Sequence, residues 1–108
     1  MRQIVNWELL EIKYNEKNVK NLFNHMESLE LNAERGCSTS ASIIVDLENA
    51  LYLNPMLSDN ERGAIIGVLI KQLSQAEYGQ TTGISQRMGS YYVKQGIKKT
   101  VAFLNGGN

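Results

Sequence analysis

The sequence is poor in residues that build cross-linked or metal-bound cores. Among 108 residues there is one cysteine, Cys37, and one histidine, His25. A lone cysteine closes no internal disulfide, and one cysteine with one histidine does not make up a structural zinc site. We therefore expect a protein without metal or cofactor, whose fold rests on its apolar core.

Long apolar runs are also missing. No stretch approaches the roughly 18 to 20 residues that a membrane-spanning helix needs. Asn6 and Glu8 interrupt the first residues before the apolar part of a signal peptide could form, which predicts a location in the cytosol. The balance of 43% apolar and 20% charged residues is ordinary for a globular domain and argues against disorder. A chain of this length buries one modest core, which excludes a large multidomain enzyme.

The net charge of zero conceals an asymmetry along the chain. Residues 1–61 carry five basic and ten acidic side chains, a balance of −5. Residues 62–108 carry six basic side chains and one acidic side chain, Glu77, a balance of +5. This division predicts that the second half faces a polyanion while the first half does something else. The alternative is that two solvated surfaces simply differ in charge.

Apolar residues recur at the three- and four-residue spacing of helices over nearly the whole chain. The first dozen residues fit either a strand or a helix, and we favour a helix. The next helix is expected to begin at a cap formed by Asn15 and to present one apolar face, made of Val19, Leu22, Phe23, Met26 and Leu29.

The small, polar stretch 36–40 is expected to be a linker. It would join an N-terminal interaction or dimerisation arm, residues 1–42, to a second domain, residues 43–108. The following helix is expected to be capped by Ser40 or Ser42 and to end at Asn54, because proline at position 55 disfavours helical geometry in the residue before it.

Two capping boxes follow, Ser58 with Glu61 and Ser74 with Glu77. Each predicts a helix start, because the hydroxyl and the carboxylate can satisfy backbone N–H groups of the first turn. The first of these helices would bury Ala64, Ile65, Val68 and Leu69. A long final helix would begin at Ser85 and line one side with Met88, Tyr92, Ile97, Val101 and Leu104. The fold class predicted is therefore all-α.

The segment from Gln75 to Lys94 fits a helix-turn-helix. Gly79 is expected where the two helices cross, Gly83 in the turn, and Ile84 in the angle between the helices. Tyr78 and Tyr92 are expected to supply ring surface on the two inner faces.

The outer face of the second helix carries side chains suited to reading DNA. Gln pairs with adenine edges, Arg with guanine O6 and N7, and Lys with phosphate. The predicted DNA-binding residues are Ser85, Gln86, Arg87, Ser90, Tyr91, Lys94 and Lys98.

The run from Gln75 to Arg87, QAEYGQTTGISQR, resembles the core motif of many bacterial and phage helix-turn-helix proteins. Together with the segments 57–66 and 96–104, it is similar to region 4 of sigma-70-type factors, and to the short sigma-like late-gene activators of phages and prophages of Gram-positive bacteria. The resemblance covers about residues 43 to 104. It departs from the family at Gly89, where Val or Ile normally packs on the first helix. Either Met88 fills that space, or the helix kinks there.

The resemblance implies contacts with promoter double-stranded DNA and with RNA polymerase in the bacterial cytosol or nucleoid. The 42 residues ahead of it are too few for a promoter-melting region, so we expect an accessory regulator, with dimerisation as a way to double its phosphate contacts. The main alternative is a protein-binding sigma mimic that reads no DNA. A small-terminase-like subunit is a third possibility. An enzyme is not expected, because no acid is spaced to orient Cys37 and His25 as nucleophile and base.

Overall fold

The computed structural model describes residues 14–106, and within them the chain is helical with no strand. The elements are α1 (Glu16–Asn24), α2 (Met26–Glu34), α3 (Ser38–Tyr52), α4 (Asp59–Ala64), the π-helical segment η2 (Ile65–Ile70), α5 (Gln75–Thr82) and α6 (Gln86–Leu104). The all-α prediction is confirmed, as is the long final helix. The prediction for the first dozen residues lies outside the described residues.

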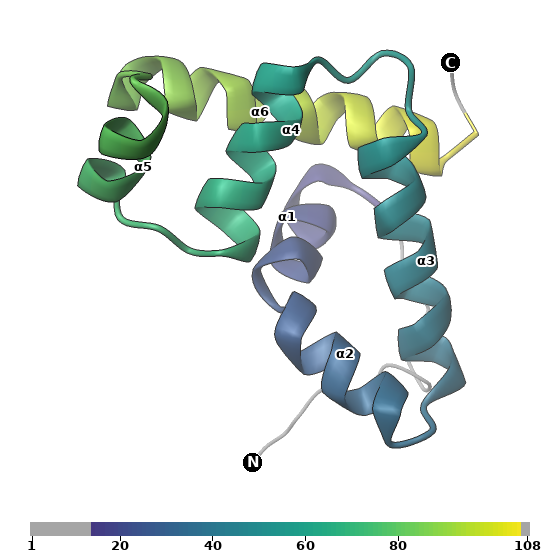
Figure 1. Ribbon diagram of the computed structural model, residues 1–108. Coiled ribbons are helices and arrows are strands. Elements are labelled where there is room, and N and C mark those ends of the chain that lie inside the picture. The colour runs from purple at the N-terminus through teal and green to yellow at the C-terminus, as the bar shows by residue number, and fades with distance from the viewer. Residues whose placement is uncertain (1–13, 107–108) are drawn as a thin grey trace.

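The long helix α6 is the element that most others share (Figure 1). Its C-terminal half crosses α4 and lies beside the end of α3, while its first turns extend to α5. Helices α1 and α2 lie below α4 and η2 in this view, and α2 packs along α3. The molecule therefore has a broad helical base and a projecting end formed by α5 and the start of α6.

The predicted helix starts are confirmed where a side chain caps the backbone. The Asn15 side chain accepts a hydrogen bond from Asn18 N at 2.8 Å, and the hydroxyl of Ser85 accepts one from Met88 N at 3.2 Å. Both capping boxes form, with each serine accepting from the glutamate's backbone and each glutamate accepting in return. These caps are local in sequence, which is why spacing alone locates them.

Two predicted boundaries are wrong. The helix expected to run from Asn15 through Leu29 is broken at His25, whose backbone leaves helical geometry and whose Nδ1 lies 2.7 Å from the Asn21 carbonyl oxygen. The next helix begins at Ser38, earlier than the predicted caps Ser40 and Ser42, because the Cys37 sulfur accepts from Ser40 N at 3.4 Å. Ser40 is fully buried inside that helix.

The buried core takes side chains from both sides of the predicted boundary between residues 42 and 43. Phe23 and Leu29 belong to the same cluster as Leu47, Ile65 and Ile97. The expected linker is reduced to a short turn at positions 36 and 37, where Gly36 has a positive φ of 97°. The helices of the first part thus contribute directly to the hydrophobic core of the second.

A polar contact also joins the start of α1 to α3. The Tyr14 hydroxyl donates to Asp46 Oδ2 at 2.7 Å, and burial together with that carboxylate raises the pKa of Tyr14. This hydrogen bond fixes where the chain enters the described fold.

The helix that begins at Ser58 widens before it ends. Ala64, Ile65 and Leu69 are buried as predicted, and Val68 is half-buried against the core. From Ile65 to Ile70 the helix is π-helical, and the N–H of Lys71 reaches back five residues to Ile66 O at 2.8 Å. Gln72 then adopts a positive φ of 56°, and its side chain donates to Asn24 O at 2.8 Å.

A partly buried ion pair holds α4 against α6. Lys99 Nζ lies 2.9 Å from both carboxylate oxygens of Glu61, which is also the acceptor of the Ser58 capping box. Burial opposes ionisation, but the hydrogen bonds from Lys99 and Ser58 outweigh it and hold the pKa of Glu61 below its usual range. Beside the pair, a Cβ atom on Gly96 would lie 2.9 Å from Ile65 Cδ1, so glycine permits the close crossing.

Candidate nucleic-acid interface

Two helices joined by a short turn lie where the sequence predicts a helix-turn-helix. Helix α5 is capped by Gly83, which has the left-handed φ of 75°, and three residues separate the end of α5 from the start of α6. The Thr82 hydroxyl donates to Tyr78 O at 2.7 Å and accepts from Ile84 N at 3.1 Å, which fixes the turn. Ile84, between the two helices in the chain, is half-buried against the core.

The contact between the two helices differs from the prediction. Met88 is 41% exposed, whereas Gly89 is buried, and α6 runs without a break past both. A Cβ atom on Gly89 would lie 2.9 Å from Tyr78 Cε2. The ring of Tyr78 therefore occupies the space that a Val or Ile side chain would need, and neither a rotated Met88 nor a kink is required.

Tyr78 is held on its other edge by η2. A Cβ atom on Gly67 would lie 3.0 Å from Tyr78 Cδ1, so the ring lies between two glycines from two different elements. Gly79, expected at the close crossing, faces only the Ile84 carbonyl oxygen, and a Cβ there would lie at an ordinary 3.5 Å. Burial raises the pKa of Tyr78, so its hydroxyl stays neutral.

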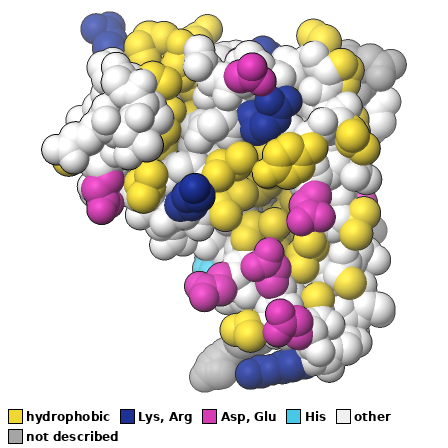
Figure 2. Space-filling model, in the orientation of Figure 1, with side chains coloured by type: hydrophobic (Ala, Val, Ile, Leu, Met, Phe, Trp, Pro, Cys, Tyr) yellow, Lys and Arg dark blue, Asp and Glu magenta, His cyan; other side chains and the backbone are white. Residues whose placement is uncertain are grey.

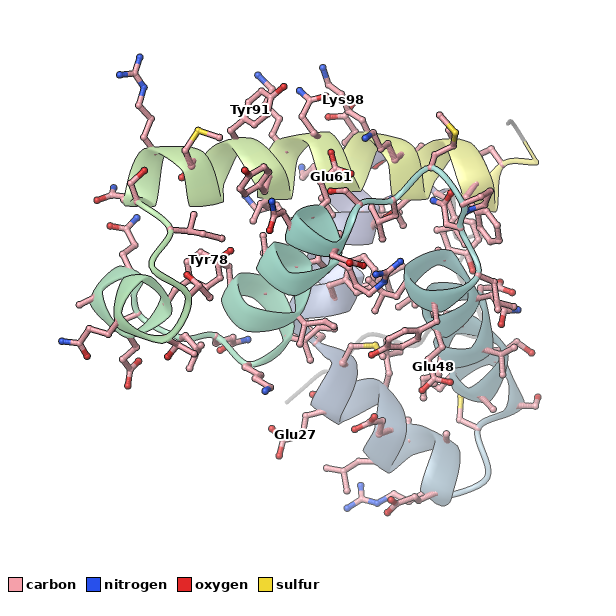
Figure 3. The ribbon with its side chains drawn as sticks, turned by 45° about the horizontal axis from the view of Figure 1, so that its top comes forward. Glu27, Glu48, Glu61, Tyr78, Tyr91 and Lys98 are labelled. Carbon is pink, nitrogen blue, oxygen red and sulfur yellow. The ribbon has the colours of Figure 1, made fainter. Side chains whose placement is uncertain are left out.

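Tyr78 is the only buried residue of α5. The first helix of the motif is thus attached mainly through one aromatic side chain, whose position shows in Figure 3 between α5 and the rest of the molecule. The other tyrosines divide as expected, since Tyr91 is exposed and Tyr92 is half-buried against the core.

The seven predicted DNA-binding residues are all exposed. Arg87, Tyr91, Lys94 and Lys98 recur at spacings of three and four residues and therefore share one face of α6. Figure 3 shows Tyr91 and Lys98 pointing away from the bundle on the same side of that helix. Ser85 uses its hydroxyl as the helix cap.

Gln86 and Ser90 lie on a neighbouring strip of α6 that borders a groove of about 450 Å³ between α1, η2, α5 and α6. Lys94 stands where the strip and the outer face meet, because it also lines the groove. The structure thus divides the predicted set into two surfaces. The outer stripe consists of Arg87, Tyr91, Lys94 and Lys98, and the groove edge consists of Gln86 and Ser90.

Two basic residues that the sequence did not single out also line this groove, Lys17 and Lys20 of α1. Both are exposed. They belong to the acidic half of the sequence, and only the packing of α1 beside α6 brings them near Lys94. Their spacing of three residues on one helical face was the only available signal.

Acidic side chains gather elsewhere. Figure 2 shows them over α2 and the adjoining part of α3, and Figure 3 labels Glu27 and Glu48 there. Helix α6 contains no acidic residue. The acids of α2 and α3 therefore lie away from the exposed basic side chains of α6.

Residues 14–106 contain neither a cluster of metal-ligating side chains nor a helix suited to cross a membrane. No three His, Cys, Asp or Glu side chains in that range are grouped to hold a metal ion. None of the described helices is long and apolar enough to cross a membrane.

No family model, curated protein or solved structure matches the chain. The resemblance to sigma region 4 accordingly stays a prediction made from the sequence.

Proposed function

We propose that this protein is a sequence-specific DNA-binding transcription regulator, a phage or prophage accessory factor of the sigma region 4 kind. The first half of α6 would enter the major groove. The observation that carries the proposal is the outer stripe of α6, where Arg87, Tyr91, Lys94 and Lys98 stand together on a helix without any acid. A helix-turn-helix presents its second helix to DNA in this way.

The proposed contacts are of two kinds, with base edges and with phosphates. Arg87 would pair with guanine and Gln86 with adenine, because both reach base edges with two hydrogen bonds. Lys94 and Lys98 would contact phosphates, and Lys17 and Lys20 of α1 would extend that contact. Ser90 and Tyr91 would adjust the fit between these two kinds of contact, and Ser85 would keep the helix start in place.

The partners follow from the same proposal. Residues 1–42 would act as an interaction or dimerisation element, since the acids of α2 suit a basic protein surface. A homodimer would present two copies of α6, the proposed recognition helix, to adjacent DNA half-sites. RNA polymerase would be the second macromolecular partner.

The test is a fluorescence-anisotropy titration of the full chain on a mixed library of short duplexes at two salt concentrations. Salt-sensitive binding that enriches a sequence is expected, and light scattering on the same sample gives the mass. Arg87→Ala should weaken binding to the enriched sequence by about 1–3 kcal/mol, whereas Lys98→Ala should lower affinity on all sequences alike. Arg35→Ala removes a base at the far end of α2 and is the matched control.

A protein-binding role without DNA is the second candidate, and one surface favours it. Tyr52, Leu53 and Met56 are each at least 60% exposed, beside a hollow of about 330 Å³ lined by Pro55 and Phe103. Exposed apolar residues grouped in this way are typical of protein contacts. Absence of binding to any duplex at low salt, with capture of purified RNA polymerase, would favour this role.

A further inference from the structure

The groove beneath the recognition helix has an apolar floor that DNA contact does not explain. Its floor is lined by Val68 and Leu69 of η2, Leu73, the ring of Tyr78, and Val93 and Ile97 of α6. A volume of about 450 Å³ falls in the range of roughly 300–1,000 Å³ typical of small-molecule sites.

The rim of the groove is polar and mainly basic. Lys17 and Lys20 stand on the α1 side and Lys94 on the α6 side, against one acid, Glu16. The uncharged polar groups at the other end are Gln75, Gln86 and Ser90. An occupant complementary to both surfaces needs an apolar body for the floor and a negative charge for the rim.

We propose that the groove binds a small amphipathic anion, a single-chain carboxylate with an unbranched apolar tail. The tail would lie along the floor between η2 and α6, and the carboxylate would pair with Lys17, Lys20 or Lys94. From Gln86 to Ile97 the α6 wall is about 16 Å long at the usual rise per residue, which suits an extended tail.

This site would be coupled to DNA binding, a consequence that rests on the proposed function. Gln86, Ser90 and Lys94 line the groove and also belong to the residues proposed to meet DNA. A carboxylate at the rim would neutralise Lys94 and cover its neighbours, so ligand and DNA would compete for the same side chains.

The direct test is an NMR titration of the full chain with dodecanoate, kept below its micelle concentration, with calorimetry for stoichiometry. One molecule per chain is expected, with shift changes confined to amides around the groove such as Leu73, Gly89 and Lys94. Dodecyltrimethylammonium has the same tail and the opposite charge, and should bind at least tenfold more weakly. Equal binding of the two probes, or shifts centred on the exposed surface around Tyr52, would overturn the proposal.

Two variants locate the ligand. Ser90→Phe places a ring at the groove edge from an exposed position and should lower dodecanoate affinity at least tenfold, whereas Tyr91→Phe, one residue along and outside the groove lining, should leave it unchanged. Lys20→Gln should weaken dodecanoate but not the cationic probe. Unchanged affinity in Ser90→Phe, with the circular dichroism spectrum of the parent, would contradict the site.

Competition with a duplex is measured separately by anisotropy, so the two proposals fail independently. Dodecanoate binding in the groove without any DNA binding would leave the ligand site standing and remove the proposed function. DNA binding without dodecanoate binding would support the proposed function and remove the ligand site.

Discussion

The first turns of α6 and the rest of that helix are attached to the molecule in different ways. The part from Val93 onward buries Val93, Gly96, Ile97 and Thr100 among several helices and adds the ion pair of Glu61 with Lys99. The first part of the helix, residues 86–92, buries Gly89 alone, against the ring of Tyr78. One end of the helix therefore carries stability, and the other end keeps its polar surface free for binding.

The same contrast separates α3 from α5. Helix α3 buries five residues, Ser40, Ile43, Leu47, Ala50 and Leu51, whereas α5 buries only Tyr78. Elements with few buried contacts open most readily in native proteins, so α5 and the start of α6 should open before the base does.

Removing the Tyr78 ring should have the largest effect. Tyr78→Ala is expected to destabilise the packing of α5 by about 3–5 kcal/mol, as for other large aromatic residues truncated in a core. Hydrogen exchange should show protection lost over residues 75–82 and retained in α3. Tyr78→Phe keeps the ring and is the control. A uniform loss of protection over the whole chain would show that the two regions are not separable.

Breaking the ion pair between Glu61 and Lys99 tests the part of α6 that packs on α4. Glu61→Gln should lower the free energy of unfolding by about 1–3 kcal/mol, less than for a fully buried pair, because the Lys99 side chain that loses its partner is 34% exposed. Chemical denaturation measures this value. Asp59→Asn, which removes the fully exposed partner of Arg62, should change stability far less.

A pair of glycine variants sharpens the comparison within the helix-turn-helix. Gly89→Ala should destabilise by about 1–3 kcal/mol through overpacking against Tyr78, reduced by the better helix propensity of alanine. Gly79→Ala meets no close atom and should be neutral or stabilising by up to about 1 kcal/mol. Thermal melts of the two variants decide the matter, and equal melting temperatures would contradict the close contact.

The smallest effect concerns pH. Because the pKa of Glu61 is lowered in the fold, its ionised form stabilises the protein above the usual glutamate pKa near 4.5, and this contribution is lost as the pH falls through the lowered value. The stability difference between the parent and Glu61→Gln should therefore shrink in acid. A difference that stays constant from neutral pH to pH values below that range would argue against the pair.

Local features of the fold could be predicted from the sequence. The caps at Asn15, Ser58, Ser74 and Ser85 and the turn at Gly83 depend on residues within four positions of one another, so spacing is enough to find them. The outer stripe of α6 was predictable for the same reason, because helical periodicity fixes which residues share a face.

The features that were missed depend on contacts between distant segments. The fit of Tyr78 between Gly67 and Gly89 involves three elements, and a glycine in a helix carries no sign of which side chain it faces. Lys17 and Lys20 reach the candidate interface only because α1 packs beside α6, far along the chain. The break at His25 follows from a side-chain contact with the backbone that the apolar pattern does not encode.

The π-helical segment bears on how the chain tolerates a change in length between α4 and α5. A π-helical turn holds one residue more than an α-helical turn, so deleting one residue from Ile65–Ile70 would allow a continuous α-helix there. Each residue of an α-helix advances its direction by about 100°, so one extra residue in an unbroken α-helix would turn everything after it by that angle, whereas the wider π-helical turn takes up the residue without this rotation. Deleting one residue from Ile65–Ile70 should thus leave the direction of the following chain, and of the side chains proposed to meet DNA, nearly unchanged.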